Sequence, residues 1–440
     1  MFRVQIMVRL LVIAVFLFVS CNRAKAIDLD ASKTPAGLFL DSLLSNIGQS
    51  DPNLPHGNAL ITEFVAAGDN CALLKSDDGI TWTVFQGSET PFPGCNGGVI
   101  YDLAYGNGTL VAVGTLSSHF LNRSNNCGLW TSTDSVNWTR HECPASDNKG
   151  QPNTPIRSIG FGKAGGVDTF LAAGLKLSGS QNDFTYSIIS SNGGASWEYR
   201  KIPGPPTPGN AAGGEYGSCF IQFNDSAAYC TMENQTLTGI AMPLHQYVPS
   251  NGAWNVNQDG PGGYDTPLPV MPPNYNPRSF FLFSAKNSVM YSFGLFNSAT
   301  TGGTVYADRK FSNGQPWNVS AEGLTFSAPG VRMNAAADTN SKLVLVGDQC
   351  NWMYSTDLTN SGQPLQNWIT QTSMKDCQRT DWADLTYNSK LNRYVGVGVQ
   401  SSNPPKGYIT VTAGDPIGGS DWLVTSTALN GRINAVISKH

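Results

Sequence analysis

Seven tryptophans recur along the chain at intervals of 51 to 63 residues, and this spacing constrains the fold more than any other feature. The 440-residue chain has ten tryptophans in all, so most of them mark a repeat. Similarity at a fixed period of this length is typical of architectures in which each unit packs against the next. The seven marker residues are Trp82, Trp138, Trp197, Trp254, Trp317, Trp368 and Trp422.

Each repeat contains short segments whose pattern predicts β-strands. An alternating segment such as 99–105 comes first, and a more apolar segment ending in glycine follows, as in 110–114 and 394–398. A third strand then leads through a tight turn to the tryptophan and a fourth strand. The pattern predicts an all-β fold, a seven-bladed β-propeller of four-stranded antiparallel blades over residues 57–440.

The first and last repeats are incomplete in complementary ways. The first repeat begins directly with a segment of the apolar, second type at 60–68, whereas the chain ends with a segment of the first type at 432–438. Segment 432–438 also resembles residues 332–336, which begin the sixth repeat. We therefore expect the C-terminal strand to join blade one and close the ring, because closure leaves no large sheet edge exposed.

Three repeats carry a polar turn before the tryptophan. In segments 76–82, 132–138 and 190–197 a serine is followed by Asp or Asn and then by the tryptophan. These turns resemble the Asp box, or BNR repeat, of sialidase-like and photosystem-assembly-type propellers. Asp and Asn oxygens accept backbone N–H groups in such turns, so we interpret the boxes as structural rather than catalytic. The residues assigned to them are Ser76, Asp78, Trp82, Ser132, Asp134, Trp138, Ser190, Asn192 and Trp197.

Six of the nine cysteines occupy equivalent places in three repeats. One cysteine precedes the third strand and another follows the fourth, which predicts a local disulfide in each of these blades. Two more cysteines lie on the first two strands of blade four. The predicted pairs are Cys71–Cys95, Cys127–Cys143, Cys219–Cys230 and Cys350–Cys377. The alternative, a metal site, lacks any ligand spacing, so we expect neither metal nor cofactor.

The N-terminal residues 1–20 have the pattern of a secretory signal. Two arginines precede an apolar run at 10–19, which is too short to cross a bilayer as a helix. Segment 18–21 resembles a bacterial lipobox, although Phe18 departs from the usual leucine. The resemblance implies a lipid on Cys21, which would also leave an even number of cysteines. The alternative is cleavage near Ala24 or Ala26 and free secretion.

Residues 21–56 would then be the lipidated cysteine and its tether. The stretch 29–38 is similar to the tethers of leptospiral lipoproteins, and spirochaetal lipoproteins tolerate departures from the lipobox. We therefore expect a monomer that is held to a bacterial membrane by its lipid. Placement at the outer membrane or cell surface is expected rather than at the inner membrane.

Four arginines begin predicted innermost strands and would lie near one mouth of the central channel. Guanidinium groups in that position could clamp a carboxylate or sulfate. The alternative is ordinary pairing with Asp102, Asp384 or Glu215. Two tyrosines lie in a long loop rich in proline and glycine, where aromatic rings suit recognition. These candidate ligand-binding residues are Arg157, Arg278, Arg332, Arg432, Tyr264 and Tyr275.

The net charge of −4 excludes the basic footprint of a nucleic-acid-binding protein. Together with the anchor, the propeller predicts a binding or adhesion scaffold for a protein or a glycan, without catalytic activity. One alternative is an envelope assembly factor that docks a membrane protein. Another is a sialidase-like glycoside hydrolase, which would need an arginine triad and paired acid and nucleophile groups that the sequence does not assign.

Overall fold

The computed structural model divides the chain into two compact units, Met1–His56 and Gly57–His440. All described residues belong to the second unit. The expectations for Cys21 and for the tether 21–56 therefore lie outside the described residues. The described residues are 62–117, 126–145, 155–176, 184–203, 216–223, 227–234, 244–257, 280–284, 289–296, 304–311, 318–325, 333–339, 342–356, 368–371, 374–377, 379–401, 404–412, 414 and 416–439.

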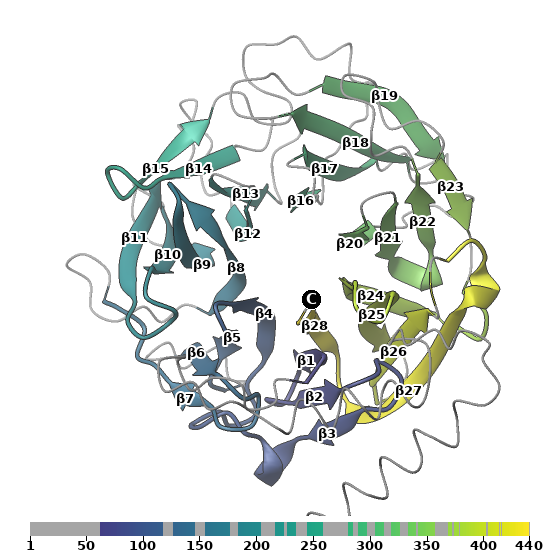
Figure 1. Cartoon of the computed structure of the whole chain (residues 1–440), viewed down its shortest axis with the longest axis horizontal. Helices are drawn as coiled ribbons and strands as arrows, with labels where there is room; N and C mark the ends of the chain where they lie inside the picture. Colours follow the sequence, from purple (N-terminus) through teal and green to yellow (C-terminus); the bar gives the residue numbers. More distant parts are fainter. Residues whose placement is uncertain are drawn as a thin grey trace, which may run out of the picture. The chain divides into compact units, whose positions relative to one another are not determined.

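Within these residues, the strands form seven antiparallel sheets of four strands each, which confirms the all-β class. In Figure 1 the innermost strand of each sheet lies nearest the centre and the outermost strand lies at the periphery, and the strands of each sheet are given below in that order. Sheet 1 is β28 (Ile433–Ser438), β1 (Phe64–Gly68), β2 (Leu73–Ser76) and β3 (Thr83–Phe85); sheet 2 is β4 (Ile100–Gly106), β5 (Thr109–Thr115), β6 (Cys127–Ser132) and β7 (Thr139–Arg140). Sheet 3 is β8 (Ile156–Ala164), β9 (Val167–Lys176), β10 (Phe184–Ser190) and β11 (Glu198–Pro203).

The remaining four sheets each use consecutive strands. Sheet 4 is β12 (Tyr216–Phe223), β13 (Ala228–Asn234), β14 (Leu244–Val248) and β15 (Ala253–Asn257); sheet 5 is β16 (Phe280–Ser284), β17 (Val289–Phe296), β18 (Thr304–Phe311) and β19 (Asn318–Thr325). Sheet 6 is β20 (Met333–Asp338), β21 (Leu343–Gly347), β22 (Trp352–Ser355) and β23 (Trp368–Gln371); sheet 7 is β24 (Thr380–Asn388), β25 (Arg393–Gln400), β26 (Lys406–Thr412) and β27 (Trp422–Asn430). Short 3₁₀ turns lie at η2 (Gly87–Glu89), η3 (Asp348–Cys350) and η4 (Gly419–Asp421).

Each innermost strand lies beside the innermost strands of two other sheets. The order of contact runs β28, β4, β8, β12, β16, β20, β24 and back to β28 (Figure 1). No helix in the described ranges is long and apolar enough to cross a membrane.

The apolar second strands are buried on both faces because each lies between two neighbouring sheets. In β1, Phe64 and Ala66 pack into the cluster shared with sheet 7, whereas Val65 and Ala67 pack into the cluster shared with sheet 2. Side chains alternate between the faces of a strand, so a strand covered on both sides reads as a continuous apolar run. The core is therefore a series of layers between sheets rather than one central mass.

Glycine ends several second strands because the backbone of the innermost strand comes very close there. A Cβ atom built at Gly114 would collide with the carbonyl oxygen of Val99, and one built at Gly68 would collide with that of Arg432. Gly398 faces the carbonyl of Asp381 in the same way. The glycines noticed in the repeat are thus required by close packing of two backbones within a sheet.

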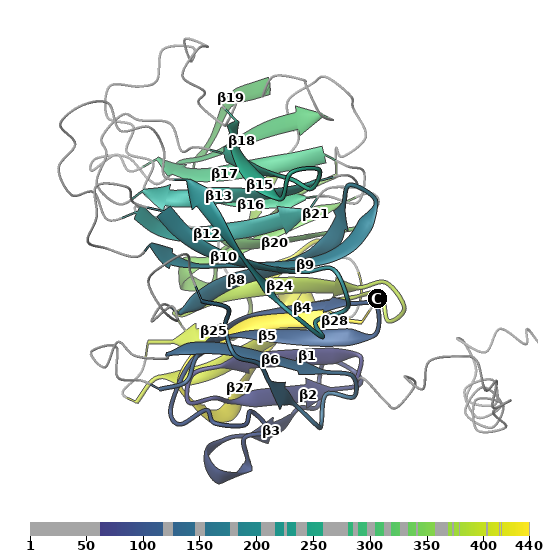
Figure 2. The same cartoon turned by 90° about the vertical axis from the view of Figure 1, so that its left-hand side faces the viewer.

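Strand β28 pairs with β1 although the two strands are the last and the first of the second unit in the sequence. The register runs antiparallel from Phe64 opposite Ser438 to Gly68 opposite Ile433, and Figure 2 shows β28 among the early strands. Without β28, the buried strand β1 would expose its backbone N–H and C=O groups, which is costly in an apolar layer.

We expect Val436→Pro to destabilise the second unit by about 2–3 kcal/mol, because proline removes the N–H that the buried carboxyl of Asp384 accepts. Val436 lies opposite Ala66 in the register with β1, and its N–H is donated away from β1 to Asp384 Oδ2 at 2.8 Å. Val436→Ala is the control: it keeps the N–H and loses two methyl groups, at about 1–2 kcal/mol. Urea unfolding followed by fluorescence measures both. Equal stability of the two variants would contradict the importance of the hydrogen bond from Val436 to Asp384.

Candidate functional site

The innermost strands all begin at one face of the ring, which we call the start face. A register shift occurs near the beginning of six innermost strands. In β12 it spans Tyr216 to Cys219, and in β4, β8, β20, β24 and β28 it is a β-bulge between two adjacent ladder pairs. Each bulge leaves one residue outside the ladder, and bulges commonly redirect a side chain at a functional site. The unpaired residues are Tyr101, Arg157, Asn334, Ala383 and Asn434.

Side chains at or next to the bulges hydrogen-bond to the next innermost strand. Asn434 Nδ2 donates to the carbonyl of Ile100 at 3.0 Å, and Asn334 Nδ2 donates in the same way to the carbonyl of Trp382 at 2.8 Å. Each asparagine also donates to an aspartate of its own sheet, Asp69 and Asp348 respectively. The similarity of segments 332–336 and 432–438 therefore reflects a repeated contact between sheets.

In three other sheets the side chain one residue after the bulge forms the contact, and there it accepts a backbone N–H group instead of donating. Asp102 Oδ2 accepts the N–H of Ile159 at 2.8 Å, and Asp384 Oδ2 accepts that of Val436 at 2.8 Å. The hydroxyl of Ser158 accepts the N–H of Ile221 at 3.0 Å. These five contacts place a polar side chain at five of the seven joints between innermost strands, including both joints that hold β28.

Arg157 and Tyr101 meet across the joint between sheets 3 and 2. The guanidinium carbon lies 4.6 Å from the centre of the tyrosine ring, which is a cation–π contact. Burial raises the pKa of the Tyr101 hydroxyl, the charge of Arg157 opposes this increase, and Asp69 adds to it. Arg157 and Asp69 are therefore both close enough to act on the same hydroxyl.

Arg432 immediately precedes β28, and its backbone is fixed by Asp69. The N–H of Arg432 donates to Asp69 Oδ2 at 2.9 Å, and the N–H of Asp69 donates to the carbonyl of Arg432 at 2.9 Å. Within the described residues, the Nε atoms of Arg157 and Arg432 are buried without an acceptor. Neither guanidinium lies within 4.0 Å of a described carboxylate. The start face thus carries two cations that are not neutralised by a described ion pair.

The expected pairing of these arginines with Asp102 or Asp384 does not occur in the described part of the chain. Both carboxylates instead accept two backbone N–H groups each, one from the following residue and one from the next sheet. The sequence reveals the acid but not its partner, because a backbone donor leaves no mark in composition. Glu215, Arg278, Arg332, Tyr264 and Tyr275 lie outside the described residues.

Burial raises the pKa values of both carboxyl groups. Asp102 rises to about 6, against the opposing effect of its hydrogen bonds to Ile159, Leu103 and Ser158. Asp384 rises to about 7, first through burial and then through the negative charge of Asp102. The two acids therefore act on each other's ionisation from either side of β28.

The polar turns at the rim are structural, as their hydrogen bonds show. Asp78 Oδ1 accepts the N–H groups of Ile80 and Thr81 at 2.8 and 2.7 Å, and Trp82 Nε1 donates to the carbonyl of Gly79. Asp134 accepts the equivalent pair of N–H groups in sheet 2. Hydrogen bonds to Asn137, Val136 and Ser132 outweigh burial and hold the pKa of Asp134 at about 2.

The third turn uses an amide in place of the carboxylate. Asn192 Oδ1 accepts the N–H of Ser196 at 3.0 Å, and the hydroxyl of Ser190 accepts the N–H of Gly194 at 2.9 Å. Trp197 Nε1 donates to the carbonyl of Gly194 at 3.1 Å. All the accepting side chains in these turns are thus engaged with backbone, as a turn requires.

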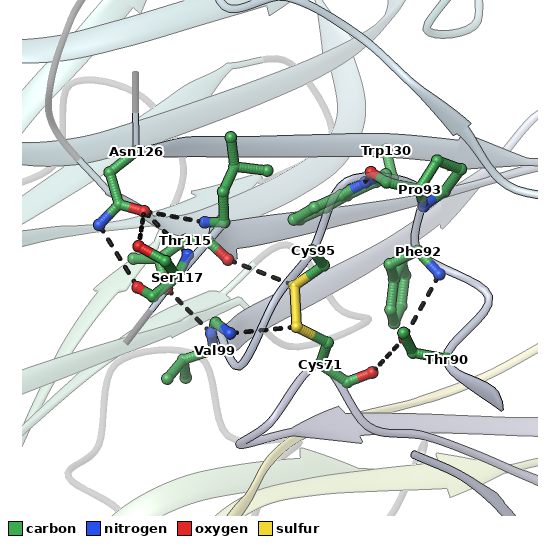
Figure 3. Close-up of a disulfide and its surroundings, with 12 residues drawn as sticks. Cys71, Thr90, Phe92, Pro93, Cys95, Val99, Thr115, Ser117, Asn126 and Trp130 are labelled. Carbon is green, nitrogen blue, oxygen red and sulfur yellow. Dashed lines mark hydrogen bonds between the residues drawn. A yellow bond between two sulfur atoms is a disulfide. The ribbon is translucent and has the colours of Figure 1, made fainter. Parts of the chain in front are cut away.

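Four disulfides join the cysteine pairs expected from the repeat: Cys71–Cys95, Cys127–Cys143, Cys219–Cys230 and Cys350–Cys377. Figure 3 shows Cys71–Cys95, which ties the turn after β1 to the segment that leads into β4. Around it, the hydroxyl of Thr90 donates to the carbonyl of Cys71 at 2.6 Å, and Trp130 Nε1 donates to that of Pro93 at 3.0 Å (Figure 3). The bridge thereby fixes the loop that carries Asp69 to the start face.

The second bridge of this kind repeats the arrangement in sheet 6. Cys350–Cys377 follows Asp348, just as Cys71 follows Asp69. Gln349 and Cys350 both have positive φ angles, as do Asn70 and Cys71. Left-handed backbone at two consecutive non-glycine residues needs strong local support, and the disulfide and the Asp–Asn contact supply it.

No family model matches the chain, and no curated protein matches it in sequence. Solved structures do match in fold. A periplasmic gluconolactonase from Pseudomonas aeruginosa has a TM-score of 0.51 at 12% identity, covering 85% of this chain and 98% of its own. An α-L-arabinanase from Penicillium chrysogenum has a TM-score of 0.45 at 14% identity, covering 77% and 93%. YCF48 bound to a D1 peptide has a TM-score of 0.44 at 12% identity, covering 78% and 91%. The prediction of a β-propeller is confirmed.

One expectation from the sequence is contradicted by the matches in fold. The chain was expected not to be an enzyme, whereas a protein that shares its fold is a gluconolactonase. The turns at Asp78, Asp134 and Asn192 are structural, but this says nothing about catalysis elsewhere in the protein. The expectation of no enzymatic activity therefore rested only on the lack of a recognisable catalytic motif in the sequence. It is withdrawn.

Between pH 5 and pH 8 we expect stability to fall as the pH rises. Asp102 and Asp384 hold protons up to about pH 6 and 7 when folded, but release them near pH 3.8 when unfolded. The folded state therefore binds more protons in this window, and stability decreases toward its upper end. The decrease should be about 1 kcal/mol or more, since one unit of pKa is worth about 1.4 kcal/mol.

Denaturant unfolding at several pH values measures this slope, and Asp384→Asn should flatten it. Asp134→Asn is the matched control, because that carboxyl has a lowered pKa of about 2 and is ionised throughout the window. A slope that is unchanged in Asp384→Asn would refute the assignment.

Proposed function

We propose that this chain is a lipid-anchored extracytoplasmic binding protein whose start face recognises a carboxylate group of a protein or glycan. The observation that carries the proposal is the pair Arg157 and Arg432. Arg157 lies in the innermost strand β8 and Arg432 immediately precedes β28, and neither guanidinium has a described carboxylate within 4.0 Å. A bound carboxylate would supply charge-assisted hydrogen bonds, which are stronger than neutral ones.

The setting of the two arginines favours recognition over a purely structural role. Arg157 is held by the ring of Tyr101, and Arg432 is held through its backbone by Asp69. Guanidinium groups whose position is fixed before binding lose less entropy when a ligand arrives. Asp69 itself is fixed by Asn434 and by the neighbouring disulfide, so the support extends into two sheets.

The four disulfides indicate a protein that folds outside the cytoplasm, since such bonds persist in oxidising compartments. The anchor is supported by the sequence pattern of residues 1–21 and by the odd number of cysteines, which becomes even once Cys21 carries lipid. Placement at the outer membrane or the cell surface would bring the start face to a ligand presented there.

The architecture we propose is a seven-bladed propeller closed by β28, with Asp boxes at the rim of blades one to three. It is supported by the seven sheets and by the pairing of β28 with β1. The backbone-accepting turns at Asp78, Asp134 and Asn192 support the Asp boxes. Such a ring gives a rigid surface on which loops and strand starts can place a ligand.

We expect peptides with a free C-terminal carboxylate to bind about tenfold more tightly than the same peptides as amides. Acidic oligosaccharides should likewise bind more tightly than neutral ones. The double variant Arg157→Gln/Arg432→Gln should lose this preference, and added salt should weaken binding to the parent protein. Isothermal titration against a panel of peptides and oligosaccharides measures both effects.

Arg140→Gln is the matched control, because it removes one exposed positive charge from the outermost strand of sheet 2. The proposal would be contradicted if Arg140→Gln also lost the preference for a free carboxylate, or if the parent protein showed no such preference. A peptide from an envelope membrane protein as the tightest ligand would favour an assembly role. Release of a fluorogenic sugar by the purified protein would favour a glycoside hydrolase and overturn recognition alone.

The anchor is tested independently of the ligand. We expect the protein expressed in a bacterium with its own first 20 residues to enter the detergent phase after Triton X-114 extraction. Cys21→Ala should leave it in the aqueous phase, because the acyl chains supply the membrane affinity. Mass spectrometry of the N-terminal peptide identifies the lipid. An unmodified N-terminus at or after residue 25 would show free secretion instead.

A further inference from the structure

A recess lies at the periphery between sheets 3 and 4, beside the end of β8 rather than its start. It has a volume of about 220 Å³ and is bounded by the β8–β9 turn, the polar turn after β10, strand β11 and the β14–β15 turn. Ligand pockets for drug-sized molecules measure about 300–1,000 Å³. The recess therefore suits a ligand the size of a single ring.

Part of the lining of the recess is apolar. Val167 and Pro249 line it from two different sheets, and Tyr247 lines it as well. Val167 is 51% exposed. A ligand whose C–H face covers this side chain would remove apolar surface from water.

The rest of the lining is largely polar but has no net charge. Arg200 Nη2 and Glu198 Oε2 lie 2.6 Å apart and neutralise each other, and they are the two charged residues that line the recess. Arg200 is fixed further by its Nη1 bond to the carbonyl of Tyr199 at 3.0 Å. Exposed Ser191 adds a hydroxyl that can both donate and accept.

A donor group and an acceptor group held side by side match the hydroxyls of a sugar, each of which both donates and accepts. We propose that this recess binds one neutral monosaccharide unit, with its C–H face on Val167 and its hydroxyls toward Glu198, Arg200 and Ser191. The proposal is independent of the start face, where the guanidinium charges select an anion. Because the ion pair is internally neutral, a uronic acid should bind here less well than the corresponding hexose.

The experiment is saturation-transfer difference NMR of the parent protein with methyl glycosides of glucose, galactose, mannose and N-acetylglucosamine, and with methyl glucuronide. We expect at least one neutral glycoside to bind with a Kd in the millimolar range. Val167→Trp should weaken binding about tenfold or more by filling the recess, and Ser191→Ala should weaken it by a smaller factor.

Val136→Trp is the matched control, since Val136 is a valine of similar exposure, 56%, in the turn of sheet 2. It should leave binding unchanged, and circular dichroism checks that each variant is folded. If Val167→Trp does not fold, Ser191→Ala decides on its own. The proposal would be overturned if no neutral glycoside bound. It would also be overturned if Val136→Trp weakened glycoside binding as much as Val167→Trp, or if the glucuronide bound more tightly than the neutral glycosides.

The start-face arginines separate this proposal from the proposed function. Arg157→Gln/Arg432→Gln should retain the neutral glycoside, whereas Val167→Trp should retain the preference for a free carboxylate. Loss of the neutral glycoside in the arginine variant would place the sugar at the start face and overturn the recess as its site.

Discussion

The pairing of β28 with β1 is the contact on which the rest of this ring depends. β1 is buried on both faces, so its only unsatisfied direction is the edge toward the centre, and β28 covers that edge. Asp384 on one side and Asn434 on the other then attach β28 to the neighbouring sheets through backbone atoms. A strand from the far end of the unit is thereby held by three separate sets of hydrogen bonds.

The bulges near the beginnings of the innermost strands determine which side chains lie at the start face, and they also bring the side chains that join the sheets into position. Some of the unpaired residues bond to the next sheet, as Asn434 does, whereas others make different contacts, as Arg157 does with Tyr101. Equivalent positions around the ring therefore hold side chains with different roles. The asparagines join one sheet to the next, and the proposed recognition rests on an arginine at the same kind of position.

Much of the fold was visible in the sequence because it rests on local, repeated signals. The tryptophan spacing, the glycines near the ends of apolar strands and the paired cysteines each follow from packing that recurs in several sheets. The partners of Asp102 and Asp384 were not visible, since a carboxylate that accepts backbone N–H groups from another sheet has no counterpart in the sequence. The role of Asn334 and Asn434 was missed for a similar reason, although the repeated Arg-x-Asn-Ala segment that contains them was seen.

The long sequence distance between β1 and β28 has a consequence for how the protein reaches its final form. When a chain leaves the cytoplasm with its N-terminus first, β1 emerges long before β28, so the first sheet has an open edge until the later strands have emerged. Pairing over such a distance is slow, and an open strand attracts chaperones, proteases and other chains. Local disulfides such as Cys71–Cys95 form within a short span, and they keep that first sheet in shape during the interval.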